Sequence, residues 1–180
     1  MNRMTGKALV VIALVFACVG LFFQEARAEK KIGILLFNDQ PRYVQNKNGV
    51  IDQLKKQGFG EPAVKFTVES AGGNKVRAVE LARKFAAAKM DLVIPIGTSA
   101  AVVAANEIKD IPIVFVMVWD PVESKIATDW KSSGNNTTGA SSKTPASKLL
   151  GVLKELAAVK KVAVLYTSGE RNSEIQVKEF

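Results

Sequence analysis

The chain has 180 residues, with 25 Lys and Arg against 17 Asp and Glu, one Cys and no His. The absence of His excludes imidazole bases, Ser-His-Asp triads and His-ligated zinc. The length suits one domain or one and a half, and a hydrophobic share of 48% is enough to build a packed core.

The amino-terminal segment has the pattern of an export signal. Arg3 and Lys7 precede an apolar run over residues 8–23, and the small residues Ala26 and Ala28 follow it. A basic part, an apolar part and a small-residue site in this order are typical of a secretory signal peptide. We therefore expect the first 28 residues to be a signal peptide cleaved after Ala28, and the mature protein to be periplasmic.

Two other interpretations of this segment are less favoured. The apolar run is shorter than the ~20 residues that span a bilayer, which argues against an uncleaved anchor. Cys18 could belong to a lipidation box, but Phe16 is bulky for such a box and apolar residues continue after the cysteine. A lipoprotein is therefore not expected, and no cysteine remains beyond Ala28.

The charge of the mature part does not indicate a nucleic-acid partner. Residues 29–180 hold 22 basic and 16 acidic residues, a net charge of +6. The basic residues occur singly or in pairs such as Lys55-Lys56 and are spread among helical stretches. This pattern is typical of a solvated surface, and no nucleic acid is expected as a partner.

Short apolar runs alternate with longer amphipathic ones through most of the mature sequence. This alternation predicts a parallel sheet covered by helices, a doubly wound α/β fold. The predicted strands are residues 31–37, 63–69, 90–96 and 111–118, and the helices between them are residues 43–58, 74–89 and 99–109. The last two strands are almost continuously apolar, as expected for central strands, although Pro95 removes one backbone donor from the first of them.

The pattern is looser beyond Val118. Residues 131–136 are rich in turn formers, and the stretch Asn135-Asn136-Thr137-Thr138 is interpreted as a polar turn. The predicted elements that follow are a helix over 145–158, a buried strand over 161–167, a turn over 169–173 and a helix that begins near Ser173. A strand needs partners, so this last strand packs on the first sheet or the chain belongs to a two-lobed protein.

Candidate ligand-binding residues follow the predicted strands, because open parallel sheets bind ligands beyond the carboxyl ends of their strands. Four places qualify: Asn38–Pro41, Gly97–Ala100, Trp119–Pro121 and Ser168–Ser173. In Gly97-Thr98-Ser99-Ala100 the glycine permits a turn, and the hydroxyls and the free N–H groups of the next helix could hold a carboxylate or phosphate. The alternative is an ordinary N-cap.

The other places offer complementary groups. Asp120 could pair with a ligand ammonium, or it forms a turn before Pro121. Tyr43 and Trp119 could supply aromatic walls, or they pack in the core. Asn172 and Ser173 could donate hydrogen bonds from the opposite side, or they cap the terminal helix.

Motifs that carry catalysis are missing from the sequence. It contains no GxSxG elbow, no phosphate loop, no GxGxxG and no metal-ligand cluster. We therefore expect binding without catalysis and without a cofactor.

Several strings in order resemble one known family. They are Lys31–Ile34, Asp91–Ala101, Asp110–Phe115, Asp120–Val122, Asn136–Gly139 and Tyr166–Ser173. Together they are similar to the substrate-binding components of ABC importers with the type I periplasmic-binding-protein fold, some of which are associated with aromatic amino acids such as tryptophan. The resemblance runs from about Lys31 to Phe180.

The resemblance implies two doubly wound lobes that trap a ligand between them by hinge closure. Family members are about twice this length, so residues 29–141 are expected to form a complete first lobe and residues 142–180 the start of a truncated second one. Carried over by residue, Thr98 and Ser99 would meet the ligand carboxylate and Asp120 its amino group. Asn172 and Ser173 would contact the ligand from the second lobe.

The sequence departs from the family pattern in two places that bear on ligand identity. Relatives often have His before the proline where this chain has Gln40, and a small hydroxylated residue where it has Trp119. The prediction is an extracytoplasmic solute-binding component of an ABC importer, with a membrane permease as partner and a small amino-acid-like or carboxylated ligand. The alternative is a sensory or scaffolding domain of the same fold that acts through protein contacts.

Overall fold

The computed structural model describes residues 29–180, so the predicted signal peptide lies outside the described residues. A five-stranded parallel sheet with the order β2-β1-β3-β4-β5 forms its centre. The strands are β1 (Lys30–Leu36), β2 (Val64–Ser70), β3 (Leu92–Ile96), β4 (Ile113–Val118) and β5 (Thr137–Ser141). All five run in the same direction, so their carboxyl ends lie at one edge.

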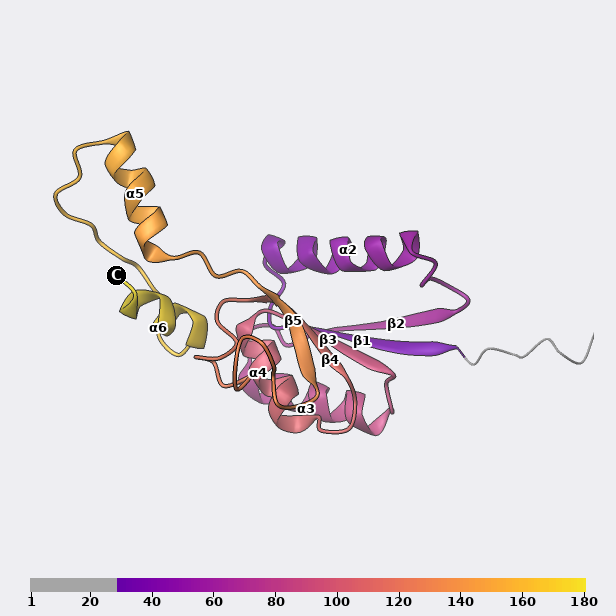
Figure 1. Ribbon diagram of the computed structural model, residues 1–180. Helices are drawn as coiled ribbons and strands as arrows, with labels where there is room; N and C mark the ends of the chain where they lie inside the picture. Colours follow the sequence, from indigo (N-terminus) through magenta and orange to yellow (C-terminus); the bar gives the residue numbers. More distant parts are fainter. Residues whose placement is uncertain (1–28) are drawn as a thin grey trace, which may run out of the picture.

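Helices cover both faces of this sheet. As Figure 1 shows, α2 (Pro41–Lys56) lies on one face, and α3 (Lys75–Ala87) and α4 (Thr98–Glu107) lie on the other. Pro41 begins α2, where its missing N–H is not needed. Asn74 caps α3 by accepting a hydrogen bond from the Arg77 N–H at 3.1 Å. The predicted doubly wound α/β fold is confirmed.

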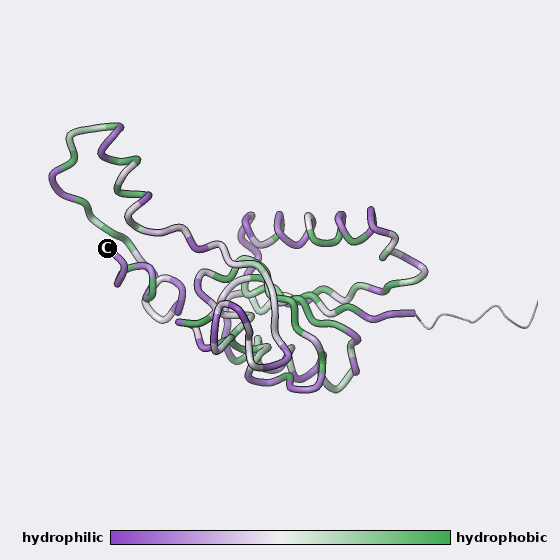
Figure 2. Tube along the Cα trace, viewed as in Figure 1, coloured by the Kyte–Doolittle hydropathy of each residue, from purple (hydrophilic) through white to green (hydrophobic). Residues whose placement is uncertain are grey.

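The core lies between the central strands and the helices. Ile32 to Leu36 of β1 are buried, and Figure 2 shows hydrophobic residues concentrated along the sheet. Phe85 of α3 is fully buried against β1, where a Cβ on Gly33 would come within 2.8 Å of its ring. Pro95 is also fully buried and does not interrupt β3. Burial of such large side chains contributes about 1.5–3 kcal/mol each.

β5 is an element that the sequence analysis missed. The predicted polar turn over 135–138 is wrong at its end, because Thr137 begins a strand that pairs with β4. Asn136 anchors the entry to β5, since its side-chain N–H donates to the carbonyls of Ile108 and Ile111. The strand is short, polar and at the sheet edge, with only Thr137 buried, so it carries no apolar signal.

The predicted strand over 161–167 is wrong. Residues 157–170 form neither helix nor strand, and no strand of the described chain lies alongside them. Without a neighbouring strand the backbone groups have no ladder to join. The side chain of Leu165 is 97% exposed as a result.

Two helices flank that extended segment. α5 (Ala146–Leu156) projects away from the sheet, while α6 (Arg171–Lys178) returns toward α4 (Figure 1). α6 begins at Arg171, slightly before the predicted start at Ser173. Leu156 of α5 is 77% exposed, so the apolar stripe of this helix has no cover within the described chain. Among residues 29–180, no helix combines the length and hydrophobicity needed to cross a bilayer.

Two glycine substitutions test how tightly β5 is packed. In Gly139→Ala the new Cβ would lie 2.1 Å from the Phe115 carbonyl oxygen, so a backbone must move. We expect a loss of about 3 kcal/mol in unfolding free energy. Gly151→Ala is the matched control, because nothing lies within 4 Å of its Cβ and alanine favours α5. Urea denaturation measures both, and equal stability of the two variants would contradict the packing of β5.

Candidate functional site

A cavity of about 300 Å³ opens at the carboxyl edge of the sheet. Its walls come from the start of α2, the β3–α4 junction, the end of β4, the segment after β5, and α6. The lining residues are Arg42, Tyr43, Gly97, Thr98, Met117, Trp119, Ser142, Asn172 and Gln176. Four of the predicted site residues, Tyr43, Thr98, Trp119 and Asn172, therefore meet in one place, together with Gly97 of the predicted turn.

Gly97 is needed at the floor of the cavity. Its φ of +94° is favourable only for glycine, and a Cβ there would lie 2.5 Å from the ring of Tyr43. Glycine thus lets the Tyr43 ring pack directly over the turn between β3 and α4. Burial raises the pKa of Tyr43. The positive charge of Arg42 opposes this rise, and the negative charge of Glu170 adds to it. The phenol therefore stays protonated at neutral pH.

The start of α4 faces this floor without a side-chain cap. The first N–H groups of the helix thus keep their partial positive charge for another acceptor. Thr98 is 3% exposed, and its hydroxyl oxygen accepts the Trp119 N–H at 3.1 Å. The hydroxyl hydrogen is then the group that Thr98 can donate to a ligand.

Ser99 and Ala100 do not line the cavity. Ser99 is half-buried on α4, and Ala100 is fully buried in the core cluster. Their backbone N–H groups lie in the first turn of α4 and point toward the amino-terminal end of the helix, which Thr98 begins. The sequence pattern located the start of the helix correctly. Of the side chains of Thr98, Ser99 and Ala100, only that of Thr98 reaches the cavity.

Asp120 is held by the protein itself. Its carboxylate is 2% exposed, and one oxygen accepts the N–H groups of Val122 and Glu123 at 3.0 and 2.9 Å. The other oxygen accepts from the Lys143 ammonium at 2.7 Å. Asp120 is not among the lining residues. It forms the turn that was the alternative interpretation, and it is the buried member of an ion pair with the more exposed Lys143.

The pKa values of this pair follow from its surroundings. Burial raises the pKa of Asp120, but Lys143 and the two N–H donors outweigh it and the net direction is downward. The carboxylates of Asp120 and Glu179 raise the pKa of Lys143. Lys143 bridges both acids, since its ammonium also lies 3.0 Å from Glu179.

Of the three remaining predicted residues, one lines the cavity and two do not. Asn172 lines the cavity from α6, whereas Ser173 lies on α6 outside the lining. Asn38 also lies outside it, and its side-chain oxygen accepts the Gln40 N–H at 3.0 Å within the turn before α2.

Four lining residues were not predicted: Arg42, Met117, Ser142 and Gln176. Gln176 follows Asn172 by one helical turn, so the helical period of α6 could have identified it. Ser142 follows β5, the strand that was itself missed. Trp119 was predicted as an aromatic wall, and its buried indole N–H has no partner among the described residues.

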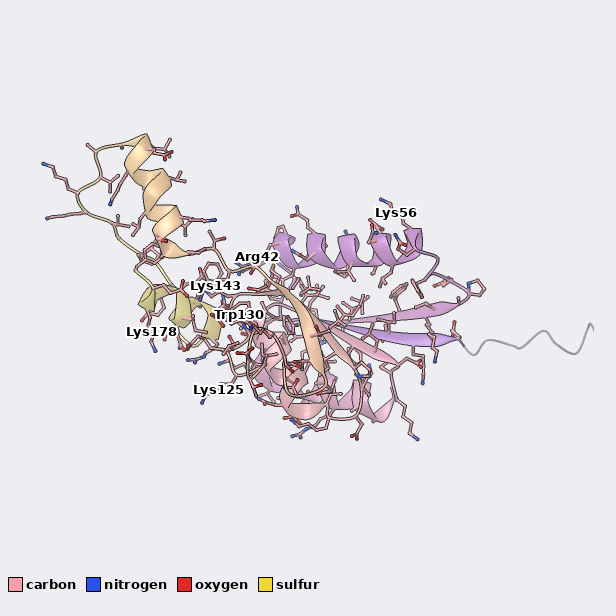
Figure 3. All side chains as sticks on the ribbon, in the orientation of Figure 1. Arg42, Lys56, Lys125, Trp130, Lys143 and Lys178 are labelled. Atoms are coloured by element: carbon pink, nitrogen blue, oxygen red, sulfur yellow. The ribbon has the colours of Figure 1, made fainter. Side chains whose placement is uncertain are left out.

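Cationic side chains hold α6 beside the cavity. The Arg171 guanidinium donates to the Glu123 carbonyl, and the Lys75 ammonium to the Gly169 carbonyl, each at 2.7 Å. Lys143 lies where α6 meets the strand ends, while Arg42 marks the start of α2 (Figure 3). Ile175 adds the buried apolar contact of α6.

Comparison with known proteins agrees with this architecture. The family model described as "ABC transporter substrate binding protein" matches residues 31–180. A tyrosine-binding protein of Clostridioides difficile (strain R20291) is 33% identical over 155 residues, which make up 85% of this chain and 45% of that protein.

Two solved structures resemble the chain at similar identity. One is an ABC domain in complex with L-Trp from Streptococcus pneumonia, with a TM-score of 0.81, 32% identity and coverage of 85% of this chain and 52% of that one. Another is a ligand-free, open substrate binding protein with adhesive properties from Clostridium difficile. Its TM-score is 0.71 at 33% identity, and the match covers 83% of this chain and 52% of that one. The chain spans about half the length of these relatives.

The Asp120–Lys143 pair makes folding stability depend on pH. Because the folded pKa of Asp120 is lowered, its contribution is present above the unfolded pKa of about 3.9 and is lost as pH falls through the folded value. The raised pKa of Lys143 gives a contribution that is present below about 10.4 and is lost as pH rises through the folded value.

We expect Lys143→Met to lower the unfolding free energy by about 1–2 kcal/mol near neutral pH. The difference from the wild type should shrink as the pH is lowered below about 4. Urea titrations at several pH values measure it, and Lys148→Met on the exposed face of α5 is the matched control. A difference that stays constant down to strongly acidic pH would contradict the ion pair.

Proposed function

The chain belongs to the ABC transporter substrate-binding protein family, and we propose that it binds a small amino-acid-like or carboxylated solute in the cavity at the carboxyl edge of the sheet. The observation that carries this proposal is the convergence, in one cavity of about 300 Å³, of an uncapped helix start, a buried hydroxyl and two aromatic side chains. A few polar groups within a largely preformed, partly apolar cavity are typical of small-molecule sites. Binding without catalysis is the corresponding activity.

The lining residues suggest how such a solute lies. Its carboxylate would accept hydrogen bonds from the first N–H groups of α4 and from the Thr98 hydroxyl, with Arg42 adding positive charge. Its apolar part would lie against Tyr43 and Trp119. Named relatives that bind tyrosine or carry L-Trp support an aromatic solute.

We further propose that residues 29–141 form a first lobe and that residues 142–180 begin a second. Asn172 and Gln176 of α6 reach the cavity, which suits a second lobe that closes over the ligand. The exposed apolar side chains of Leu156 and Leu165 are consistent with further structure packing on this part. The length of the relatives supports the same proposal.

The proposed setting is extracytoplasmic. The basic, apolar and small-residue order of the first 28 residues supports export through a cleaved signal peptide. Family membership supports delivery of the solute to a membrane permease of an ABC importer.

Isothermal calorimetry of the purified protein with aromatic amino acids and the corresponding deaminated carboxylates tests the proposal. We expect saturable heat with at least one of the two series. We also expect Thr98→Val to weaken that binding roughly tenfold, the effect of losing one good hydrogen bond to a charged group.

Intrinsic fluorescence then places the ligand. The chain has two tryptophans. Trp119 lies in the cavity wall, whereas Trp130, labelled in Figure 3, is 57% exposed and is not among the lining residues. A ligand without an indole ring should change the fluorescence of the wild type and of Trp130→Phe, but not of Trp119→Phe. Saturable binding by none of the compounds would overturn the proposed function.

A further inference from the structure

The cavity contains positive but no negative charge among its lining side chains. Among residues 29–180, Arg42 is the only charged residue in its lining, and the uncapped start of α4 adds partial positive charge. Glu170 acts on the pKa of Tyr43, but its carboxylate does not line the cavity. A ligand carboxylate would be attracted here, while a ligand ammonium would find no counterion on the walls.

Asp120, the acid that follows the lining residue Trp119 in the sequence, is already paired with a cation. Lys143 in turn follows the lining residue Ser142, so this ion pair joins two segments that line the cavity. Three donors hold the Asp120 carboxylate, the Lys143 ammonium at 2.7 Å among them, and the residue is 2% exposed.

A ligand ammonium that paired with Asp120 would have to compete with Lys143 for a carboxylate that is 2% exposed. Lys143 is part of the chain, so its pairing with Asp120 costs no association entropy, whereas that of a free ligand does. Glu179 also holds Lys143 in place at 3.0 Å, and a second cation beside it would be repelled. The internal cation therefore already pairs with the carboxylate that would otherwise be available to a ligand amino group.

We propose that this cavity selects aromatic carboxylates without an amino group, such as arylpropionates, and that Lys143 is the residue that determines this selectivity. The inference deepens the proposed solute-binding function and rests on it. Arg42 and the start of α4 attract the carboxylate, and Tyr43 and Trp119 contact the ring. The Lys143 ammonium pairs with the Asp120 carboxylate in place of a ligand amino group.

Paired ligands in calorimetry test the inference. L-Trp is compared with indole-3-propionate, and L-Tyr with 3-(4-hydroxyphenyl)propionate, on the purified wild-type protein. We expect the deaminated member of each pair to bind about tenfold tighter or more. In Lys143→Met, which frees the Asp120 carboxylate, this ratio should fall about tenfold or reverse.

Control variants separate this role from a structural one. Lys148→Met makes the same substitution on exposed α5 and should leave the ratio unchanged. Adding Asp120→Asn to Lys143→Met should abolish the gain in amino-acid affinity. Lys143→Gln, whose amide can still donate to Asp120, serves as a second variant if Lys143→Met does not fold, and it should lower the ratio in the same direction.

The outcomes are distinguishable. If the wild type binds the amino acids as tightly as the deaminated ligands or more tightly, the inference is overturned and the proposed function stands. The same holds if neither Lys143 variant changes the ratio of the two affinities. If Glu170→Gln abolishes such amino-acid binding, Glu170 is the counterion and Lys143 has no role in selectivity. Absence of binding in both series overturns the proposed function and the inference together.

Discussion

In a parallel sheet every strand ends at the same edge, and this constraint places most of the candidate site. The chain leaves β1, β3, β4 and β5 on one side of the molecule, so residues far apart in sequence meet there. Tyr43, Gly97, Trp119 and Ser142 follow four different strands and line one cavity. No single segment contains enough groups to bind a solute, and the sheet topology brings them together.

The apolar runs of the sequence predict the central strands well because burial on both faces leaves a signal in composition. β1, β3 and β4 all carry it. β5 does not, because an edge strand with one buried residue can be built from polar side chains. Residues 161–167 show the opposite error, since an apolar run predicts strand character but cannot supply the neighbouring strand that it needs.

The candidate site was predictable only to the level of the strand ends. The rule that ligands bind at the carboxyl ends of parallel strands located Thr98 and Tyr43. It did not show that Lys143 pairs with Asp120, because that contact depends on β5 and on the path of the chain after it. Nor could it separate Thr98, which lines the cavity, from Ser99 and Ala100, which do not, since one helical turn directs successive side chains to different surroundings.

The contacts that hold α6 differ in kind from those that hold the floor of the cavity. Arg171, Lys75 and Lys143 attach the segment through hydrogen bonds and an ion pair near the surface, whereas Gly97 and Tyr43 are fixed by close packing. The Debye length is about 8 Å at physiological ionic strength, so exposed ion pairs weaken as more salt is added, whereas apolar packing does not depend on this screening. Added salt should therefore weaken the polar attachment of α6 before it affects the packed floor of the cavity, and Ile175 is the apolar contact of α6 that remains.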